Sequence, residues 1–233
     1  VPFVVTTTLS NIDLPFDGQI GSTTKNDLSP ADKKAVDVEV TCSTCKNFTS
    51  ITLSTTVAPK NLETASTNGA LSIKVFDSNG VPVKDADVHI VNNSVNPNIV
   101  IDDVTDSDGI LQVVDAPPGT NTYQITVSKT GYSTDMTYTP GAVGNPTPTK
   151  PHATVIIQQL TQISFSIDRL STFTFSSVTP ECVVVPSLDF SMKGEKVIGT
   201  NIPKYTQNLI TNGSGIYSNS TMEWDSYTVT GID

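Results

Sequence analysis

Hydrophobic and polar residues alternate along much of the chain, and this alternation predicts β-strands. Clear runs lie at residues 36–40 (Val-Asp-Val-Glu-Val), 71–76 and 123–127. Side chains on a strand point to opposite faces in turn, so a period of two suits a sheet with one buried face. Val, Ile and Thr fill many of these positions, and β-branched residues favour strands over helices. No segment shows the spacing of a long amphipathic helix.

Turn-forming residues separate these runs at short intervals. Residues 77–80 (Asp-Ser-Asn-Gly) and 106–109 (Asp-Ser-Asp-Gly) each stand between two strand-like runs, and Pro-Pro-Gly follows at 117–119. Asp, Asn and Gly tolerate the left-handed backbone that tight turns require. Short strands at this spacing, with Gly-rich turns, are typical of sandwiches and barrels. We therefore predict an all-β fold.

Four motifs occur in order at residues 75–88, 105–109, 117–119 and 123–132. They read Val-Phe-Asp-Ser-Asn-Gly-Val-Pro-Val-Lys-Asp-Ala-Asp-Val, Thr-Asp-Ser-Asp-Gly, Pro-Pro-Gly and Tyr-Gln-Ile-Thr-Val-Ser-Lys-Thr-Gly-Tyr. On these motifs, the segment from about 69 to 135 resembles the carboxypeptidase regulatory-like family. The resemblance implies a seven-stranded, prealbumin-like sandwich of the kind attached to exported proteins, and it carries over no catalytic residues.

A second, divergent copy of this sandwich is expected at about residues 183–233. Residues 188–194 are interpreted as its opening strand, and residues 211–217 echo residues 105–111. The copy lacks the Gly-x-Pro-Val and Pro-Pro-Gly motifs of the first.

The N-terminal part predicts a β-hairpin. Two alternating runs between residues 36 and 57 flank the loop at 42–47. Residues 36–58 also resemble the last strands of pilin-like minor subunits, although the hydrophobic N-terminal helix of that family is absent from the sequence.

Three segments follow from these patterns. Residues 1–65 form an N-terminal β segment, 69–169 the carboxypeptidase regulatory-like sandwich, and 170–233 the second sandwich. The predicted fold class is all-β, with tandem prealbumin-like or Ig-like sandwiches after an N-terminal β-hairpin segment. Because the sequence opens in a strand-like run and stops directly after another, we expect it to be part of a longer protein.

Composition narrows the class of partner. The formal net charge is −10, whereas a surface that binds nucleic acid needs clustered Lys and Arg to replace the counterions of the phosphates. No run of about 18 apolar residues is present, so we expect no membrane insertion. These features suit an extracellular, secreted protein at a cell surface.

The cysteines are Cys42, Cys45 and Cys182, and the only histidines are His89 and His152. A zinc site is not expected, because the Cys-Ser-Thr-Cys pair lacks a second pair of ligands at matching spacing. A disulfide between Cys42 and Cys45, or between either of them and Cys182, suits an exported protein. Free thiols remain the alternative.

Candidate chemistry is sparse, and no enzyme activity is expected. The two histidines leave few ways to build a base beside a nucleophile. Asp106 and Asp108, with Asp102 and Asp103 nearby, offer carboxylate oxygens for Ca²⁺, but Asp-x-Asp-Gly is also common turn chemistry. We favour the turn and expect no other cofactor.

Trp224 and Tyr227 are candidates for a platform on which sugars stack. The alternative, which we favour, buries Trp224 as a core or corner aromatic.

The expected function is that of a non-catalytic structural or adhesive ectodomain in a surface or pilus-like protein. Its partners would be proteins or glycans at the cell surface, or other filament subunits. The alternative function is a carbohydrate-binding module accessory to an enzyme, which predicts exposed, coplanar aromatics on one face.

Overall fold

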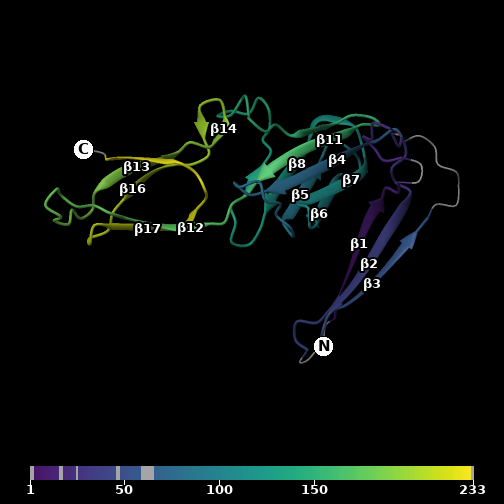
Figure 1. Ribbon diagram of the computed structural model, residues 1–233, viewed down its shortest axis with the longest axis horizontal. Helices are drawn as coiled ribbons and strands as arrows, with labels where there is room; N and C mark the ends of the chain where they lie inside the picture. Colours follow the sequence, from purple (N-terminus) through teal and green to yellow (C-terminus); the bar gives the residue numbers. More distant parts are fainter. Residues whose placement is uncertain (1–2, 16–17, 25, 46–47, 59–65, 232–233) are drawn as a thin grey trace. The chain divides into compact units, whose positions relative to one another are not determined.

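The computed structural model describes residues 3–15, 18–24, 26–45, 48–58 and 66–231. Every regular element in that part of the chain is a strand, which confirms the all-β prediction (Figure 1). None of the described residues forms a helix that could span a membrane. The chain divides into two compact units, Val1–Ser72 with Gln112–Thr120 and Thr154–Ile163, and Ile73–Leu111 with Asn121–Ala153 and Ser164–Asp233.

The N-terminal sheet consists of three antiparallel strands in the order β1-β2-β3 (Figure 1). They are β1 (Val4–Ile12), β2 (Lys33–Thr41) and β3 (Ile51–Val57). The predicted hairpin is β2–β3, and β1 extends it by one strand. Leu53 pairs with Val38, which pairs with Thr7, so these residues share one face of the sheet.

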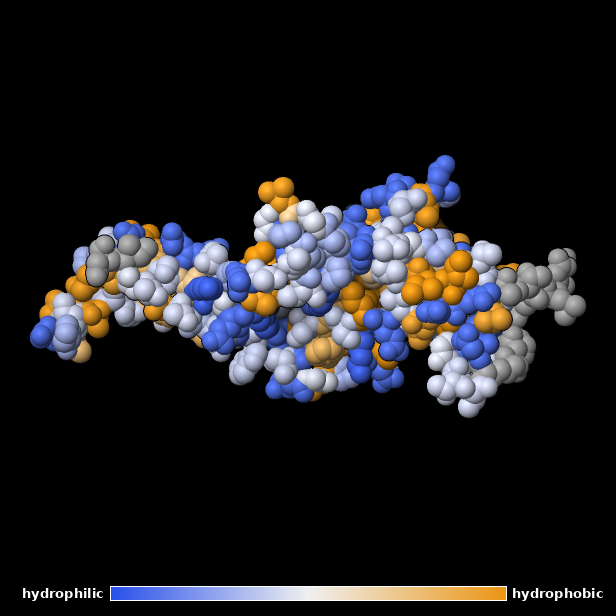
Figure 2. All heavy atoms as spheres, turned by 90° about the horizontal axis from the view of Figure 1, so that it is seen from above, coloured by the Kyte–Doolittle hydropathy of each residue, from blue (hydrophilic) through white to orange (hydrophobic). Residues whose placement is uncertain are grey.

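That face of the N-terminal sheet is exposed. Leu9 and Leu53 have relative exposures of 65% and 70%. Figure 2 shows one side of the molecule, on which hydrophobic residues lie at the surface among polar ones. Hydrophobic stabilisation of a strand pair depends on the apolar side-chain area that it removes from water. Because this face stays exposed, the sheet contributes little hydrophobic stabilisation of its own.

The first sandwich is built from two sheets, with strand orders β10-β8-β5-β6 and β11-β4-β7. The two-residue strand β9 pairs with β8. Their bounds are β4 (Gly69–Phe76), β5 (Asp87–Asn92), β6 (Ile99–Val104), β7 (Ile110–Ala116), β8 (Gly119–Ser128), β9 (Asp135–Met136), β10 (Ala153–Val155) and β11 (Leu160–Ser166).

Alternation along these strands supplies the core of the first sandwich. The predicted period of two places every second residue of β4, β5 and β8 inside. The side chains with less than 2% exposure include Leu71, Ile73, Val75, Val88, Ile90, Tyr123, Ile125, Val127, Phe165 and Ile167.

The second sandwich pairs β12 with β17 and places β13 between β16 and β18. Its strands are β12 (Ser171–Ser176), β13 (Asp189–Gly194), β16 (Thr206–Ile210), β17 (Ile216–Met222) and β18 (Tyr227–Gly231), with a small hairpin of β14 (Val197–Gly199) and β15 (Ile202–Pro203). The order β18-β13-β16 repeats β8-β5-β6, and β12-β17 repeats β4-β7. The tandem arrangement is therefore confirmed.

One prediction about the second copy is wrong. Residues 188–194 are not its opening strand, because β13 takes the central place that β5 holds in the first copy. The opening strand is β12, which begins before residue 183. Sequence alternation identifies strands but carries no label for their order in a sheet, so a divergent copy is easily read one strand out of step.

The two copies also share a turn with the same hydrogen bonds. In the first, the amide N of Asp106 donates to Ile110 O, and Asp106 Oδ1 accepts from the amides of Asp108 and Ile110. In the second, Asn212 and Ile216 make the corresponding bonds. The closing glycine of each turn, Gly109 or Gly215, has φ near +70° (+70° and +69°), where only glycine avoids strain.

A buried threonine beside each turn is the second shared device. Thr105 Oγ1 accepts from the amide of Ala86 at 2.9 Å, and Thr211 Oγ1 accepts from the amide of Leu188 at 2.9 Å. Both threonines are nearly inaccessible, with 1% and 4% exposure. The copies therefore share internal hydrogen bonds as well as strand order.

Candidate functional site

The structure places Asp106 and Asp108 in the exposed turn described above. One carboxylate oxygen of Asp106 accepts two turn amides, while Asp102 Oδ1 lies 2.6 Å from His89 Nδ1. Asp103 Oδ1 accepts from the amide of Val104. Among the described residues, these acids do not gather three ligand atoms at one point. The geometry supports the turn interpretation, and Ca²⁺ at this turn stays a prediction.

The two histidines lie in separate environments. His152 is buried, and its Nδ1 and Nε2 lie 2.9 Å and 3.0 Å from the hydroxyls of Thr137 and Thr139. Burial lowers the pKa of His152 below its usual value, because desolvation disfavours the charged ring. His89 is exposed on β5. His152 thus joins a buried hydrogen-bond network that holds the segment after β9.

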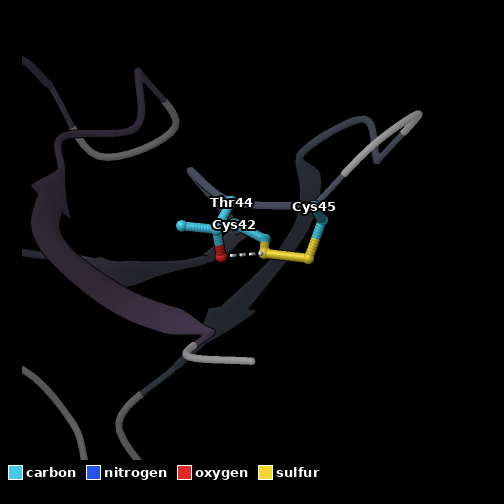
Figure 3. Close-up of a disulfide and its surroundings, with 3 residues drawn as sticks. All are labelled: Cys42, Thr44 and Cys45. Carbon is cyan, nitrogen blue, oxygen red and sulfur yellow. Dashed lines mark hydrogen bonds between the residues drawn. A yellow bond between two sulfur atoms is a disulfide. The ribbon is translucent and has the colours of Figure 1, made fainter.

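Cys42 and Cys45 form a disulfide in the connection between β2 and β3 (Figure 3). Cys42 Sγ lies 3.9 Å from the hydroxyl of Thr44, which the bridge encloses. Cys182 is exposed and is not part of a disulfide. Of the pairings that the sequence left open, the structure contains the local one.

Trp224 is 70% exposed, so the expectation that it is buried is wrong. It lies in the connection between β17 and β18. Tyr227 is partly buried instead, and its ring meets those of Phe173 and Tyr205 edge-on, at interplanar angles of 70° and 89°. Edge-on rings stabilise a core but do not present the flat faces that a sugar platform needs.

The hydroxyl of Tyr227 is fixed as well. It donates to the carbonyl O of Glu223 at 3.0 Å. Burial, together with the charges of Glu223 and Asp225, raises the pKa of Tyr227 to about 12. Tyr227, a candidate for ligand stacking, is thus an uncharged anchor within the second sandwich.

A network of ion pairs lies within the second compact unit. Lys196 Nζ is 3.0 Å from Asp168 Oδ2 and 3.6 Å from Glu223 Oε2, and Lys204 Nζ is 2.8 Å from the same Glu223 oxygen. Burial raises the pKa of Asp168, but hydrogen bonds from Ser78 and Lys196 more than offset it, so the pKa lies below 3.8. This network joins the connection between β11 and β12 to residues of the second sandwich.

A separate acidic cluster lies in the connection between β1 and β2, within the first unit. Asp13, Asp27 and Asp32 each place a carboxylate oxygen within 4.8 Å of one from each of the others. Asp27 and Asp32 are buried, at 4% exposure each. This cluster was not predicted from the sequence, because its members are spread over a long irregular connection. Their only signal was acidic residues amid Gly and Pro.

No protein-family model matches the chain, and no curated protein matches it. The solved structures with some likeness to it include the Bacillus anthracis TIE protein, with 14% identity and a TM-score of 0.32 over 86% of this chain. The Streptococcal ancillary pilin has 11% identity and a TM-score of 0.31 over 85% of this chain. The shaft pilin SpaA from Lactobacillus rhamnosus GG has 11% identity and a TM-score of 0.25 over 71% of this chain.

This chain corresponds to 37% of the TIE protein, 66% of the ancillary pilin and 87% of the shaft pilin. At these identities and TM-scores, the comparisons assign no family to the chain.

Proposed function

We propose that this chain is a non-catalytic structural or adhesive part of an extracellular surface or pilus-like protein, with sandwiches in series as spacers. The observation that carries the proposal is the duplication of one sandwich, with the same strand order, turn and buried threonine in both copies. Repeating a rigid scaffold lengthens a molecule, and leaves recognition to its loops.

The connection between the copies supports a spacer role. Only residues 167–170 separate β11 from β12. The amide of Asp168 donates to Ser133 Oγ at 3.0 Å, and the amide of Ser133 donates to Asp168 O at 2.7 Å. Lys204 Nζ donates to Thr134 O at 2.8 Å. A short connection held by backbone and ionic contacts resists bending better than a flexible linker.

The proposal also includes a family for the first sandwich, a division of the chain into segments and a class of partners. The first sandwich is assigned to the carboxypeptidase regulatory-like family on its four motifs. We divide the whole chain into three segments: residues 1–65, 69–169 and 170–233. The partners are taken to be surface proteins, glycans or neighbouring subunits.

A binding screen separates this function from the carbohydrate-binding alternative, for which the exposed Trp224 is the one favourable observation. The intact chain and the Trp224→Ala variant would be applied to glycan and extracellular-matrix protein arrays. A spacer or adhesin gives no glycan signal that depends on Trp224. Selective glycan binding that disappears in Trp224→Ala would overturn the proposal in favour of a carbohydrate-binding module.

Mechanical unfolding tests the spacer role directly. Stretching a single chain by its ends should give a separate extension step for each sandwich, at about 3.3–3.6 Å per residue released. Extension without distinct steps would contradict a function that depends on folded sandwiches in series.

A further inference from the structure

The acidic cluster of Asp13, Asp27 and Asp32 is the strongest concentration of chemistry in the described residues that the proposed function leaves unused. Hard cations are held by several convergent carboxylate oxygens. Two of these three side chains are buried, and their oxygens converge within 4.8 Å. This is the arrangement that a bound cation requires.

Backbone amides hold the three carboxylates in place. Asp13 Oδ2 accepts from the amide of Ile20 at 3.2 Å, and Asp27 Oδ1 accepts from the amide of Ser29 at 2.7 Å. The amide of Leu14 donates to Asp32 Oδ2. In each carboxylate, one oxygen is therefore fixed by the loop backbone. Such bonds orient the acids before any ligand arrives.

Asp32 provides an independent sign of a ligand. Its side chain is buried, at 4% exposure, and one of its oxygens belongs to the cluster. Its Oδ1 is inaccessible and accepts no hydrogen bond. Buried polar atoms in folded proteins nearly always have a partner, and an exception calls for a specific explanation such as an ion.

We propose that Asp13, Asp27 and Asp32 form a Ca²⁺ site. An all-carboxylate set suits a hard cation rather than zinc, which prefers nitrogen and sulfur. Calcium–oxygen distances of about 2.3–2.6 Å allow ligand oxygens on opposite sides to lie up to about 5 Å apart. The cluster oxygens lie within 4.8 Å of one another, which falls within that span. Magnesium dehydrates reluctantly and usually takes only one or two carboxylates, so a set of three suits calcium better.

The position of the site suggests what the ion does. The same β1–β2 connection packs Ile20 into a small apolar cluster with Ala70, Val114 and Leu160. Gly21, at φ +80°, lies so close that an added Cβ would come within 3.0 Å of Leu160. Calcium would therefore lock the loop that ties the N-terminal sheet to the rest of its compact unit.

Calorimetric titration of the metal-stripped 233-residue chain with CaCl₂ tests the proposal, with MgCl₂ as the competing cation. Asp32→Asn removes the charge but keeps an oxygen that can accept from Leu14. Asp13→Asn provides a second variant if the first does not fold, as checked by circular dichroism. Asp106→Asn is the matched control, because Asn212 already performs that turn role in the second copy.

The expected result is one Ca²⁺ per chain, bound more tightly than Mg²⁺, with affinity reduced at least about tenfold in either cluster variant and unchanged in Asp106→Asn. Calcium should also raise the unfolding temperature of the wild-type chain and the control, since a ligand stabilises the state that binds it. The proposal is overturned if the wild-type chain takes up no Ca²⁺, or if both cluster variants bind like wild type. Loss of binding in Asp106→Asn alone would move the site to the turn.

Discussion

The two sandwiches have the same strand order and the same turn, but their cores differ in size and kind. The first buries mainly aliphatic side chains from both sheets. In the second, the buried hydrophobic side chains among the residues described are Phe190, Met192 and Met222. The shared features are hydrogen bonds that backbone amides donate to backbone and side-chain oxygens, whereas the different ones are apolar contacts. The common strand order and turn thus go with shared hydrogen bonds, whereas the stability of each sandwich depends on its own apolar contacts.

Aromatic pairs compensate in part for the smaller buried core of the second sandwich. The ring of Phe190 lies 5.5 Å from Tyr217 and 6.0 Å from Phe175, and both partners come from the opposite sheet. Such pairs add about 0.5–1.5 kcal/mol each beyond the area they bury. That is less than a layer of fully buried aliphatic residues contributes. We therefore expect the second sandwich to open first.

The largest test truncates the equivalent central positions Ile90 and Met192, both at 0% exposure. Ile90→Ala and Met192→Ala should each lower the free energy of unfolding by about 2–5 kcal/mol. The first sandwich should stay folded, while the second, with its smaller core, should lose protection. Hydrogen exchange read by mass spectrometry distinguishes the two. If both sandwiches kept equal protection from hydrogen exchange in their variants, the proposed difference between the two cores would be wrong.

The next test removes the shared threonine hydroxyls. Thr105→Val leaves the buried amide of Ala86 without its acceptor, and Thr211→Val does the same to the partly buried amide of Leu188. Each should lower the free energy of unfolding by about 1–3 kcal/mol, as measured by urea denaturation. The exposed Thr206→Val is the control and should change little. A neutral Thr211→Val would mean that the second copy does not depend on this bond.

A smaller effect is expected from Lys196→Met, which leaves Asp168 and Glu223 without their shared cation. At neutral pH the loss should be about 1–2 kcal/mol, since Lys196 is partly exposed. The depressed pKa of Asp168 stabilises the wild-type fold above pH 3.8, and this stabilisation is lost as the pH falls through the folded-state value.

The pH dependence sharpens that prediction. Without Lys196, burial should favour the protonated form of Asp168, so the variant should regain stability relative to wild type as the pH approaches 4. Urea denaturation of both proteins between pH 7 and about pH 3.5 measures the difference. A difference that stays constant with pH would show that the ion pair contributes nothing through Asp168.

The smallest test replaces the first residue of each turn. Asp106→Ala and Asn212→Ala should each cost about 0.5–1.5 kcal/mol, because each removes the oxygen that accepts two amides. The two losses should agree closely in thermal denaturation. A much larger loss for Asp106→Ala would point to a further role for that carboxylate, such as metal binding.

Local patterns predicted much of this fold. Alternation at 71–76 and 123–127 corresponds to β4 and β8, and the Asp-x-x-Gly motifs lie in tight turns. These signals are carried by neighbouring residues, so sequence alone is sufficient to find them. The order of β12 and β13 depends on pairing between distant strands, which local patterns do not encode.

The site residues were harder to predict for the same reason. Trp224 is exposed in the connection between β17 and β18, and the hydrophobicity of its side chain gives no indication of that. Asp13, Asp27 and Asp32 meet only after the β1–β2 connection folds back on itself. The Cys42–Cys45 disulfide was one of several pairings that the sequence left open, and the fold decides among them.

The shared turn has a consequence for the evolution of surface charge. Asp77, Asp106 and Asn212 all accept two amides through Oδ1 at the first position of the turn. The backbone thus needs an oxygen there but not an ionised group. Each such turn can gain or lose one negative charge by a single Asp–Asn exchange without a change in geometry. A protein with a net charge of −10 can in this way shift its isoelectric point, and with it its solubility, independently of its fold.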